Sequence, residues 1–470
     1  MGAALRVLLI QSYLGPSVNG LCYPLGLAYI AAAAERNGHV VRIVDPNAMP
    51  DGLNALKNAI QAYDPECIGI SLRNIDSQNR TRLVYYYRYF QQTLGVAAES
   101  AADVPVIVGG PGFSMFPEKI MRRNSRVDFG VHLEAEESFP ELLDNLGRPG
   151  DVKGLYHRKD AEVVYTGVRP FPDFATLPYP RRDFLDLRPY REVPFSMGVQ
   201  TKRGCPLKCA YCNYPDLNGK NFRLRAVADI CDELAYLVND CDVRDVSFAD
   251  SILNMPPSHT MALCREIRSR KIDVRWEAYM LLSKRVDHEF AELAMQAGCK
   301  SMLFSPDGIS QPTLDKLRKG TTEQDLTDVF DLFRKNADLA PLRVGFCYFL
   351  NPPGETIRGL VKAVAFFLRV ALSRLEKGSR MRAYVNWIRI EPATRSYEIA
   401  VEEGVLDKNI DLLPDEFADL RKTFYDHPKL KAVNPILMFF LRVFNTTWDG
   451  VRRLRSSGLK AGDVPLIVEN

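Results

Sequence analysis

The first third of the chain alternates short runs of β-branched residues with segments in which apolar residues recur at helical spacing. These two periodicities are typical of buried strands and amphipathic helices. The expected strands span 6–13, 40–47, 67–73, 104–110 and 127–133. The expected helices span 26–36, 52–63, 80–94, 117–123 and 136–146. Strands that alternate with helices predict an α/β domain, a doubly wound parallel sheet with helices on both faces.

A second series of the same kind begins near residue 196. Its expected strands span 196–204, 245–250, 273–280, 301–308, 342–350 and 384–392. Helical patterns follow five of them, at 227–238, 260–270, 288–297, 324–335 and 356–376. This arrangement predicts a partial (β/α)6 barrel, in which functional residues are expected at the carboxyl ends of the strands.

These patterns divide the 470 residues into four parts. The first domain is expected over 1–147 and the barrel over 196–400. Between them, 148–195 predicts a hairpin followed by a proline-rich linker. The remaining segment, 401–470, predicts a helical C-terminal appendage. Within it, we interpret Pro428–Arg455 as a cap over the barrel rather than a helix that docks on a membrane or a peptide.

Composition and charge narrow the class of protein. The chain is 46% hydrophobic and 25% charged, as soluble globular proteins are, and its net charge of +3 gives no reason to expect a nucleic-acid partner. The N-terminus lacks the features of a signal peptide. The longest apolar stretch, Thr356 to Leu375, is interrupted by four basic residues, and Pro435 to Phe444 is shorter than the roughly 20 residues that span a bilayer. We therefore expect no transmembrane segment and a cytoplasmic location.

Three of the ten cysteines are clustered in RGCPLKCAYCNYP, directly after the first barrel strand. Cys205, Cys209 and Cys212 follow a C-x3-C-x2-C spacing, and three thiolates on one loop can ligate three irons of a [4Fe–4S] cluster and leave the fourth iron open. A zinc site normally needs a fourth Cys or His at motif spacing. The odd number of cysteines in this cluster argues against disulfides. The seven scattered cysteines are interpreted as small core residues.

The cysteine motif, with the aromatic Tyr211 before its last cysteine, resembles the radical SAM superfamily. The resemblance implies that S-adenosylmethionine (SAM) chelates the fourth iron and is cleaved reductively to a 5′-deoxyadenosyl radical. It also implies that SAM is contacted by Tyr211, by Asp250 in FADSILN, by Asp307 in FSPDG and by Gly354 in PPGET. For these last three positions, a solvated loop residue or a helix cap is the alternative.

Three segments of the first domain lie at the expected ligand edge of its sheet, at 23–41, 69–76 and 108–118. Glycines in the third segment would let a bulky ligand approach the backbone. Together with the cysteine motif downstream, these segments resemble the cobalamin-binding domains, of flavodoxin-like strand order, that precede some radical SAM barrels. The alternative is a degenerate domain for substrate positioning or dimerisation. The resemblance implies cobalamin contacts from Leu72, Arg73, Asn74, Gly109, Gly110, Gly112, Phe113 and Ser114.

The lower face of the cobalt is expected to lack a histidine ligand, because no histidine lies in a D-x-H-x-x-G motif. Arg73 ends the third expected strand, and an arginine cannot donate a lone pair to a metal. It could therefore keep that face uncoordinated. Bonding to the periphery of the cofactor, or pairing with Asp76, is an equally open interpretation.

Two such cofactors predict a methyltransferase, in which a radical activates the substrate and methylcobalamin supplies the methyl group. The expected acceptor is a carbon or phosphorus centre of a natural-product, peptide or lipid precursor, and the expected electron source is an external reductant such as flavodoxin or ferredoxin. The alternatives are cyclisation, ring contraction or oxidation with the same cofactors, and a non-catalytic sensor of cobalamin or redox state.

Substrate contacts are expected from the last two barrel strands, which carry Tyr348, Trp387, Arg389 and Glu391. Side chains two residues apart on a strand share one face, so Trp387, Arg389 and Glu391 should point the same way. A structural salt bridge between Arg389 and Glu391 is the competing interpretation.

Overall fold

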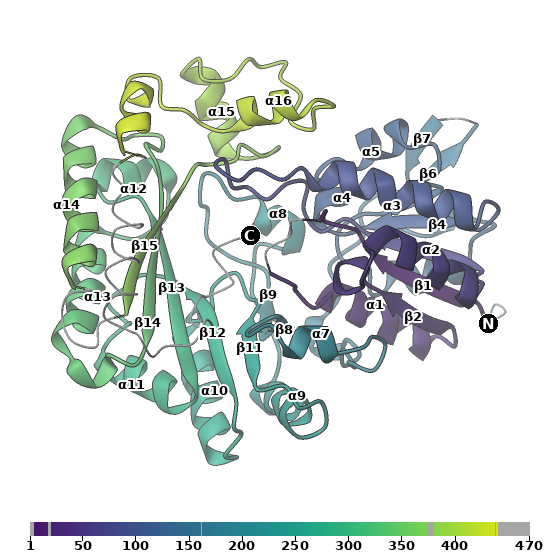
Figure 1. Ribbon diagram of the computed structural model, residues 1–470, viewed down its shortest axis with the longest axis horizontal. Helices are drawn as coiled ribbons and strands as arrows, with labels where there is room; N and C mark the ends of the chain where they lie inside the picture. Colours follow the sequence, from purple (N-terminus) through teal and green to yellow (C-terminus); the bar gives the residue numbers. More distant parts are fainter. Residues whose placement is uncertain (1–3, 17–19, 161, 374–379, 438, 440–470) are drawn as a thin grey trace. The chain divides into compact units, whose positions relative to one another are not determined.

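The computed structural model of the protein describes residues 4–16, 20–160, 162–373, 380–437 and 439 (Figure 1). Its contacts define two compact units. The first unit comprises Met1–Leu207, Asn213–Met280 and His288–Met302, and the second comprises Lys208–Cys212, Leu281–Asp287 and Leu303–Asn470. The first unit thus holds the whole N-terminal domain together with the beginning of the barrel.

The N-terminal sheet has the strand order β2-β1-β3-β4-β5-β6-β7. Its first five strands are parallel and confirm the doubly wound, flavodoxin-like arrangement. The middle of β1 is buried on both faces, as expected for a strand covered by helices on each side. The five strands are β1 (Arg6–Gln11), β2 (Val40–Val44), β3 (Cys67–Ser71), β4 (Val106–Gly109) and β5 (Phe129–Val131).

The helices of this domain are α1 (Leu25–Arg36), α2 (Gly52–Tyr63), α3 (Tyr86–Ser100), α4 (Pro111–Met115), α5 (Pro117–Arg123) and α6 (Ser138–Asp144). α1 packs against α6, and α2 packs against α3. α3 begins six residues later than the apolar spacing suggested, because side chains hold the preceding segment in a turn. Ser77 Oγ accepts from Val84 N at 3.1 Å, and Asn79 Oδ1 accepts from Arg82 N at 3.1 Å.

The segment expected as a hairpin and linker adds to this sheet. β6 (Leu155–Lys159) pairs antiparallel with β5 and with β7 (Glu162–Tyr165). The linker then contains one short helix, α7 (Arg188–Arg191). Short 3-10 helices lie at Pro46–Ala48, Pro149–Asp151, Phe174–Thr176, Ala337–Leu339, Arg421–Thr423 and Lys431–Val433.

The barrel strands of the first unit are parallel in the order β8-β11-β12. They are β8 (Met197–Val199), β11 (Asp245–Phe248) and β12 (Arg275–Met280), and the small antiparallel pair β9 (Lys202–Arg203) and β10 (Arg223–Leu224) follows β8. The accompanying helices are α8 (Tyr214–Asn218), α9 (Val227–Asn239), α10 (Pro257–Ser269) and α11 (His288–Gln296). The strands and helices alternate as predicted for a partial barrel.

The second unit continues the series. β13 (Cys299–Asp307) begins in the first unit and ends in the second, followed by β14 (Arg343–Phe349) and β15 (Met381–Asn386), which pair in parallel. β15 ends six residues before the expected boundary. The helices are α12 (Gln311–Leu317), α13 (Glu323–Lys335), α14 (Ile357–Ser373), α15 (Arg395–Glu402) and α16 (Phe417–Leu420).

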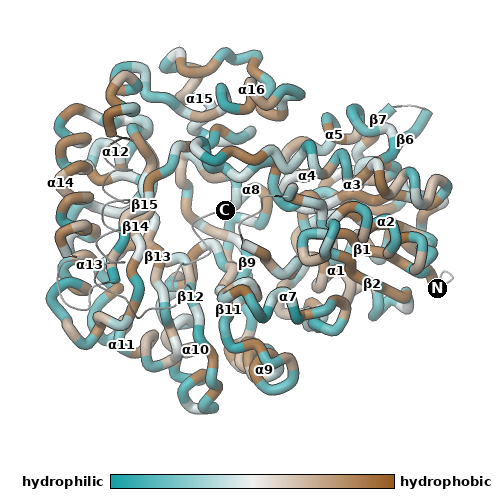
Figure 2. The backbone as a smooth tube through the Cα atoms, viewed as in Figure 1, coloured by the Kyte–Doolittle hydropathy of each residue, from teal (hydrophilic) through white to brown (hydrophobic). Residues whose placement is uncertain are grey.

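α14 corresponds to the longest apolar stretch of the sequence. It buries one face and exposes apolar residues such as Val361, Leu368 and Leu372 on the other. Figure 2 shows that hydrophobic and hydrophilic positions alternate along this helix. Among the described residues, no helix is both long and apolar enough to cross a membrane. Most of the C-terminal half of the expected cap, Pro428–Arg455, lies outside the described residues.

Candidate functional site

The carboxyl edge of the N-terminal sheet is formed by two loops that pack tightly on each other. Leu72 N donates to Gly109 O, and Gly112 N donates to the carbonyls of Leu72 and Arg73, each at 2.9 Å. A methyl group on Gly110 or Gly112 would lie 2.7 or 2.8 Å from Leu72 O. The glycines are therefore required for contact between the two loops, and not only, as the sequence suggested, for the approach of a ligand.

The other predicted cobalamin contacts occupy different environments at this edge. Arg73 and Asn74 are exposed. Phe113 is fully buried with its ring edge-to-face on Tyr156, which makes it a core residue. Ser114 is buried, and its Oγ accepts from Leu133 N at 2.8 Å. The two tight loops expose backbone groups together with the side chains of Arg73 and Asn74, and this arrangement fits a large, amide-rich ligand such as a corrin. The individual contacts with cobalamin stay predictions.

The cysteine loop starts from a conformation that only glycine adopts. Gly204 has a φ of 83°, and a methyl group there would lie 2.0 Å from Asn221 O. The loop then closes against the β9–β10 pair, where Cys205 N donates to Gly219 O at 3.0 Å. A turn in which Cys212 N donates to Cys209 O at 3.2 Å folds the end of the loop.

Of the three cysteines of this loop, Cys205 is buried, and Cys209 and Cys212 are half-buried. In the part of the chain that the structure describes, no three His, Cys, Asp or Glu side chains are grouped as a metal site. The donor set itself fits an iron–sulfur cluster, because three thiols on eight consecutive residues match the ligands that a cubane takes from protein. Ligation by these three residues stays a prediction.

Asp250 has a different place from the one expected. Its carboxylate accepts from Thr201 N at 2.8 Å, from Lys202 N at 3.3 Å and from Lys202 Nζ at 3.0 Å, and also from the Thr201 hydroxyl. Both carboxylate oxygens are engaged, and the side chain is buried. Asp250 thus anchors the strand that leads into the cysteine loop, which differs from the predicted contact with SAM.

Tyr211 and Asp307, two predicted SAM contacts, lie side by side in the second unit. The Tyr211 hydroxyl donates to Asp307 Oδ2, and the Tyr211 ring packs edge-to-face on Phe349. Lys319 completes the group: its Nζ lies 2.6 Å from Asp307 Oδ2 and 2.9 Å from the Tyr211 hydroxyl. Asp307 also has a φ of 64°, which few residues other than glycine adopt. The three side chains form a buried polar triad directly beside the cysteine loop.

The electrostatics of this triad favour a charged lysine. Burial alone would lower the pKa of Lys319, but the Asp307 carboxylate and the thiols of Cys209 and Cys212 outweigh burial and raise it. Burial and the same anionic neighbours raise the pKa of Tyr211 well above its usual value. Tyr211 therefore stays a neutral hydrogen-bond donor, and Lys319 places one positive charge near two of the expected cluster ligands.

Gly354 and Tyr348 are both set by packing. Gly354 has a φ of 83°, and a methyl group there would lie 2.8 Å from Lys316 Cβ on α12, so the turn requires glycine whether or not it contacts SAM. Tyr348 is buried, with its ring edge-to-face on Phe366 and Phe367 of α14. The structure places Tyr348 in the core between β14 and α14, which is not the pocket position that the sequence suggested.

The remaining predicted substrate contacts lie beyond the end of β15, so the argument from strand alternation does not apply to them. Trp387 is buried and Glu391 is half-buried. Arg389 is buried and donates to the carbonyls of Ile390 and Leu412, the latter at 2.8 Å. These carbonyl contacts give Arg389 a structural role in holding the C-terminal appendage, in place of the expected pocket contact.

Within the first unit, the cobalamin-side loop and the end of the cysteine loop are neighbours. α4, which carries Gly112, Phe113 and Ser114, packs against α8, which begins two residues after Cys212. Asn213 Nδ2 donates to Met115 Sδ at 3.0 Å across this contact. The helix that carries three predicted cobalamin contacts thus lies against the helix that follows the cysteine loop.

Sequence reasoning did not identify the charged residues that hold this region together. Lys319 lies outside every motif, and only its contact with Asp307 reveals it. Glu134, Glu136, Arg203 and Arg223 form a second buried cluster next to Cys205. The spacing E-A-E directly after β5 was a possible signal for the two glutamates, but nothing in the sequence pairs them with arginines about 70 to 90 positions further on.

Two protein families match this chain in the order that the fold suggests. The B12 binding domain family matches residues 12–143, and the radical SAM superfamily matches residues 199–363. The first match begins directly after β1 and covers β2 to β5 of the doubly wound sheet, and the second begins at the end of β8 and includes the cysteine loop. The chain therefore belongs to the cobalamin-dependent radical SAM enzymes.

Several of the relatives carry methyltransferase names. The chain is 28% identical to an uncharacterised methyltransferase of Pyrococcus horikoshii over 82% of this chain and 79% of that protein. It is 26% identical to tryptophan 2-C-methyltransferase of Streptomyces laurentii over 71% of this chain and 66% of that protein. The hopanoid C-3 methylase of Methylococcus capsulatus is 23% identical over 63% of this chain and 55% of its own length.

Solved structures show the same fold. The radical SAM methyltransferase TsrM of Kitasatospora setae superposes with a TM-score of 0.71 at 22% identity and covers 86% of this chain and 79% of its own. The cobalamin-dependent radical SAM enzyme OxsB superposes with a TM-score of 0.70 at 15% identity and covers 90% of this chain and 64% of its own. These similarities confirm the predicted architecture of a doubly wound sheet followed by a partial barrel.

Proposed function

We propose that this enzyme transfers a methyl group from SAM, by way of cobalamin, to a carbon centre of an organic substrate. The observation that carries the proposal is the packing of α4 against α8 within the first unit, because it joins the predicted cobalamin edge to the helix that directly follows the cysteine loop. A methyl group can pass between two cofactors only when the protein holds them at a fixed, short separation. The contact between the two helices supports such an arrangement.

The cofactors and the chain's residues have separate tasks. When bound, cobalamin supplies a transferable methyl group, and a SAM-ligated [4Fe–4S] cluster supplies one-electron chemistry that activates an unreactive carbon. Cys205, Cys209 and Cys212 would hold the cluster, while Tyr211 and Asp307 would contact the adenosyl part of SAM. The electron would come from an external reductant such as flavodoxin or ferredoxin, in the cytoplasm.

The substrate class is proposed from the relatives. The named acceptors among them, tryptophan at C2 and a hopanoid at C3, are carbon centres, which favours carbon over phosphorus as the methyl acceptor. Tryptophan is the first compound to test. A tetrapyrrole follows, because a bacteriochlorophyllide methyltransferase of Chlorobaculum tepidum is 23% identical over 63% of this chain.

The test begins without a substrate. The protein is reconstituted anaerobically with iron, sulfide and cobalamin, reduced, and supplied with SAM that carries a deuterated methyl group. We expect S-adenosylhomocysteine and labelled methyl on cobalamin, and, with the correct acceptor, a product that carries the label together with 5′-deoxyadenosine where the carbon needs radical activation. Fully loaded protein that forms neither S-adenosylhomocysteine nor labelled cobalamin would refute methyl transfer.

A second candidate keeps the cofactors but transfers no methyl group. The anaerobic magnesium-protoporphyrin IX monomethyl ester cyclase of a Synechocystis strain is 22% identical over 67% of this chain, so cyclisation occurs among the relatives. The same assay separates the two activities. Formation of 5′-deoxyadenosine without S-adenosylhomocysteine would favour cyclisation or oxidation.

A further inference from the structure

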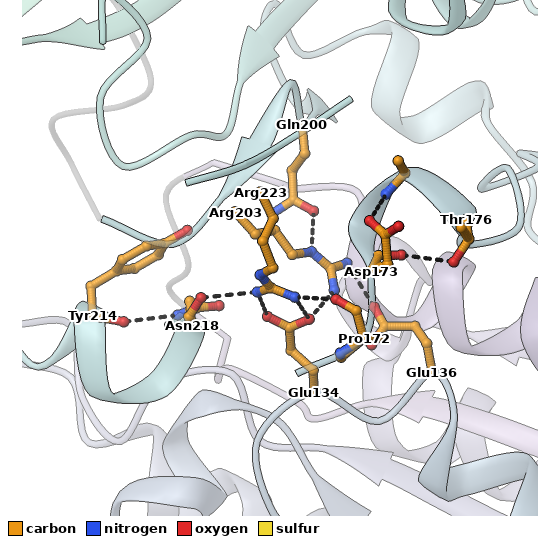
Figure 3. Close-up of polar contacts among 11 residues, drawn as sticks. Glu134, Glu136, Pro172, Asp173, Thr176, Gln200, Arg203, Tyr214, Asn218 and Arg223 are labelled. Carbon is orange, nitrogen blue, oxygen red and sulfur yellow. Dashed lines mark hydrogen bonds and ion pairs between the residues drawn. The ribbon is translucent and has the colours of Figure 1, made fainter. Parts of the chain in front are cut away.

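A buried cluster of four charged side chains joins the N-terminal domain to the strand that precedes Cys205 (Figure 3). Glu134 and Glu136 follow β5, whereas Arg203 lies in β9 and Arg223 in β10. Arg203 lies 3.0 Å from Glu134 and 2.6 Å from Glu136, and Arg223 holds both carboxylate oxygens of Glu134. All four residues belong to the first unit. We refer to them as the Glu134 cluster.

The charges of the Glu134 cluster balance, and little water reaches them. The side chains of Glu134, Glu136 and Arg203 are 5 to 7% exposed, and that of Arg223 is 18% exposed. Burial alone would lower the pKa of Arg203, but the carboxylates of Glu136 and Glu134 outweigh burial and raise it. Two carboxylates therefore neutralise two guanidinium groups, and the loss of any one side chain would leave a buried charge without its counterpart.

Both arginines also make hydrogen bonds outside the cluster. Arg203 Nε donates to Gln200 Oε1 at 3.2 Å, and Arg223 donates to Pro172 O at 2.6 Å and to Asn218 O at 2.9 Å. The Arg203 guanidinium also lies 4.9 Å from the ring centre of Tyr29 on α1. These contacts fix the orientation of each planar guanidinium group, and a lysine ammonium group could not make the same set of contacts.

The cluster is connected directly to the predicted sites of both cofactors. On one side, Leu133, the residue before Glu134, has a φ of 68° and donates its N–H to the Oγ of Ser114, a predicted cobalamin contact. On the other side, Arg203 and Arg223 are paired across β9 and β10, two residues before Cys205. Glu134 therefore lies between the cobalamin edge and the first cysteine of the loop.

We propose that Glu134 is a positioning residue, which acts through Arg203 and Arg223 to fix Cys205, the first predicted cluster ligand, relative to the B12-binding domain. The inference rests on the proposed function, because only an enzyme that uses both cofactors together needs this separation to be constant. A displacement of about 1 Å at a reacting centre can cost a factor of about 100 in rate. A buried, charge-balanced and geometrically fixed contact is well suited to prevent such a displacement.

The primary test measures how strongly the Glu134 cluster stabilises the β9–β10 segment in protein without cofactors. Glu134→Gln keeps the size of the side chain and removes its charge. Hydrogen exchange of the backbone amides of 202–206 and 219–224 should become about tenfold faster, because the local opening of this segment costs less free energy. Exchange in α13 of the second unit should not change and reports on general unfolding. Glu141→Gln, which breaks a half-exposed ion pair with Arg169 in the same domain, is the matched control and should leave 202–206 unchanged.

The second readout is spectroscopic and uses protein loaded with reduced cluster and cob(II)alamin. In the wild type, the magnetic dipolar coupling between the reduced cluster and cob(II)alamin should broaden the spectrum by one well-defined amount. In Glu134→Gln it should be weaker or broadly distributed, at equal iron and cobalamin content. If Glu134→Gln does not fold, Arg223→Lys replaces it, since this variant keeps the charge but loses the two-pronged contact with Glu134.

The outcomes separate this inference from the proposed function. Unchanged exchange in 202–206, or faster exchange with unaltered dipolar broadening, would overturn the positioning role. If the wild type forms no S-adenosylhomocysteine while Glu134→Gln shows faster exchange and altered broadening, the methyl-transfer proposal fails and the positioning role remains. A fall of about tenfold in the substrate-free formation of S-adenosylhomocysteine in Glu134→Gln, with Glu141→Gln unaffected, would support both.

Discussion

Replacement of Lys319 by methionine should destabilise the second unit substantially, because it removes one partner of a buried ion pair. Lys319 Nζ lies 2.6 Å from Asp307 Oδ2, and the two side chains are only 8% and 6% exposed. Removal of one partner of such a pair costs about 3 to 5 kcal/mol, since the other charge stays buried without compensation. For a domain of about 150 to 250 residues, this corresponds to a decrease of roughly 6 to 20 °C in the unfolding midpoint.

The pH dependence of this variant gives an independent check. Burial raises the pKa of Asp307, and the ammonium group of Lys319 counteracts that rise. Without Lys319, the folded state should bind a proton on Asp307 more strongly than the unfolded state does. The stability of Lys319→Met relative to the wild type should therefore recover as the pH falls from about 8 toward about 5, and decrease as the pH rises.

The assay is thermal unfolding of cofactor-free protein followed by near-ultraviolet circular dichroism at several pH values. Lys362→Met is the matched control, because the Lys362–Glu323 pair has the same 2.6 Å separation but is 42% and 35% exposed, and its loss should cost about 0 to 1 kcal/mol. The double variant Asp307→Asn/Lys319→Met removes both charges and should be more stable than Lys319→Met. A midpoint within about 2 °C of the wild type for Lys319→Met, or strictly additive effects in the double variant, would refute the reasoning.

Three further variants test other parts of the site. Cys209→Ala should abolish cluster absorbance and 5′-deoxyadenosine formation, while cobalamin binding persists. Cys264→Ala, which changes a buried core cysteine, should keep both cluster absorbance and 5′-deoxyadenosine formation. Loss of cobalamin binding in Cys209→Ala would contradict the division between the domains. Gly112→Ala should weaken cobalamin retention in gel filtration, because its methyl group would lie 2.8 Å from the carbonyl oxygen of Leu72. In Gly95→Ala, the control, the methyl group would have no described atom outside its own helix backbone within 4 Å, so this variant should stabilise α3 by up to about 1 kcal/mol. Tyr348→Phe should leave SAM cleavage unchanged and stability equal or higher, since its buried hydroxyl has no hydrogen-bond partner; a large loss of cleavage would return Tyr348 to the pocket.

The fold was predictable from the sequence because its signal is local. Apolar runs of strand length and helical spacings recur along most of the chain, so α2 and α5 were predicted at their observed boundaries. The errors occur where local signals are short or are overridden. α4 and α12 have five and seven residues, too few for a periodic pattern, and α3 starts late because polar side chains hold the preceding turn.

The candidate site was predictable only in part. Motif spacing identified the cysteine loop, and the structure brings Tyr211 and Asp307, which are 96 positions apart, into contact. Motif spacing did not distinguish a ligand contact from a structural one. Asp250 and Arg389 both looked like pocket residues, but their polar groups bind the chain itself. Such partners are set by tertiary packing, and a single sequence carries no record of them.

The buried charged residues of this region all act on the cysteine loop or on the residues just before it. Asp250 binds Lys202 in the strand before the loop, and Glu134 binds the next residue, Arg203. Lys319 binds Tyr211 inside the loop. Burying three ion pairs around one short segment is costly in free energy unless each is well aligned, so they contribute more to a unique geometry than to stability. An iron–sulfur cluster held by three thiols on a loop has no rigid element of its own. Its position must therefore come from the flanking residues, and in this chain buried charge pairs, rather than apolar packing alone, fix those residues.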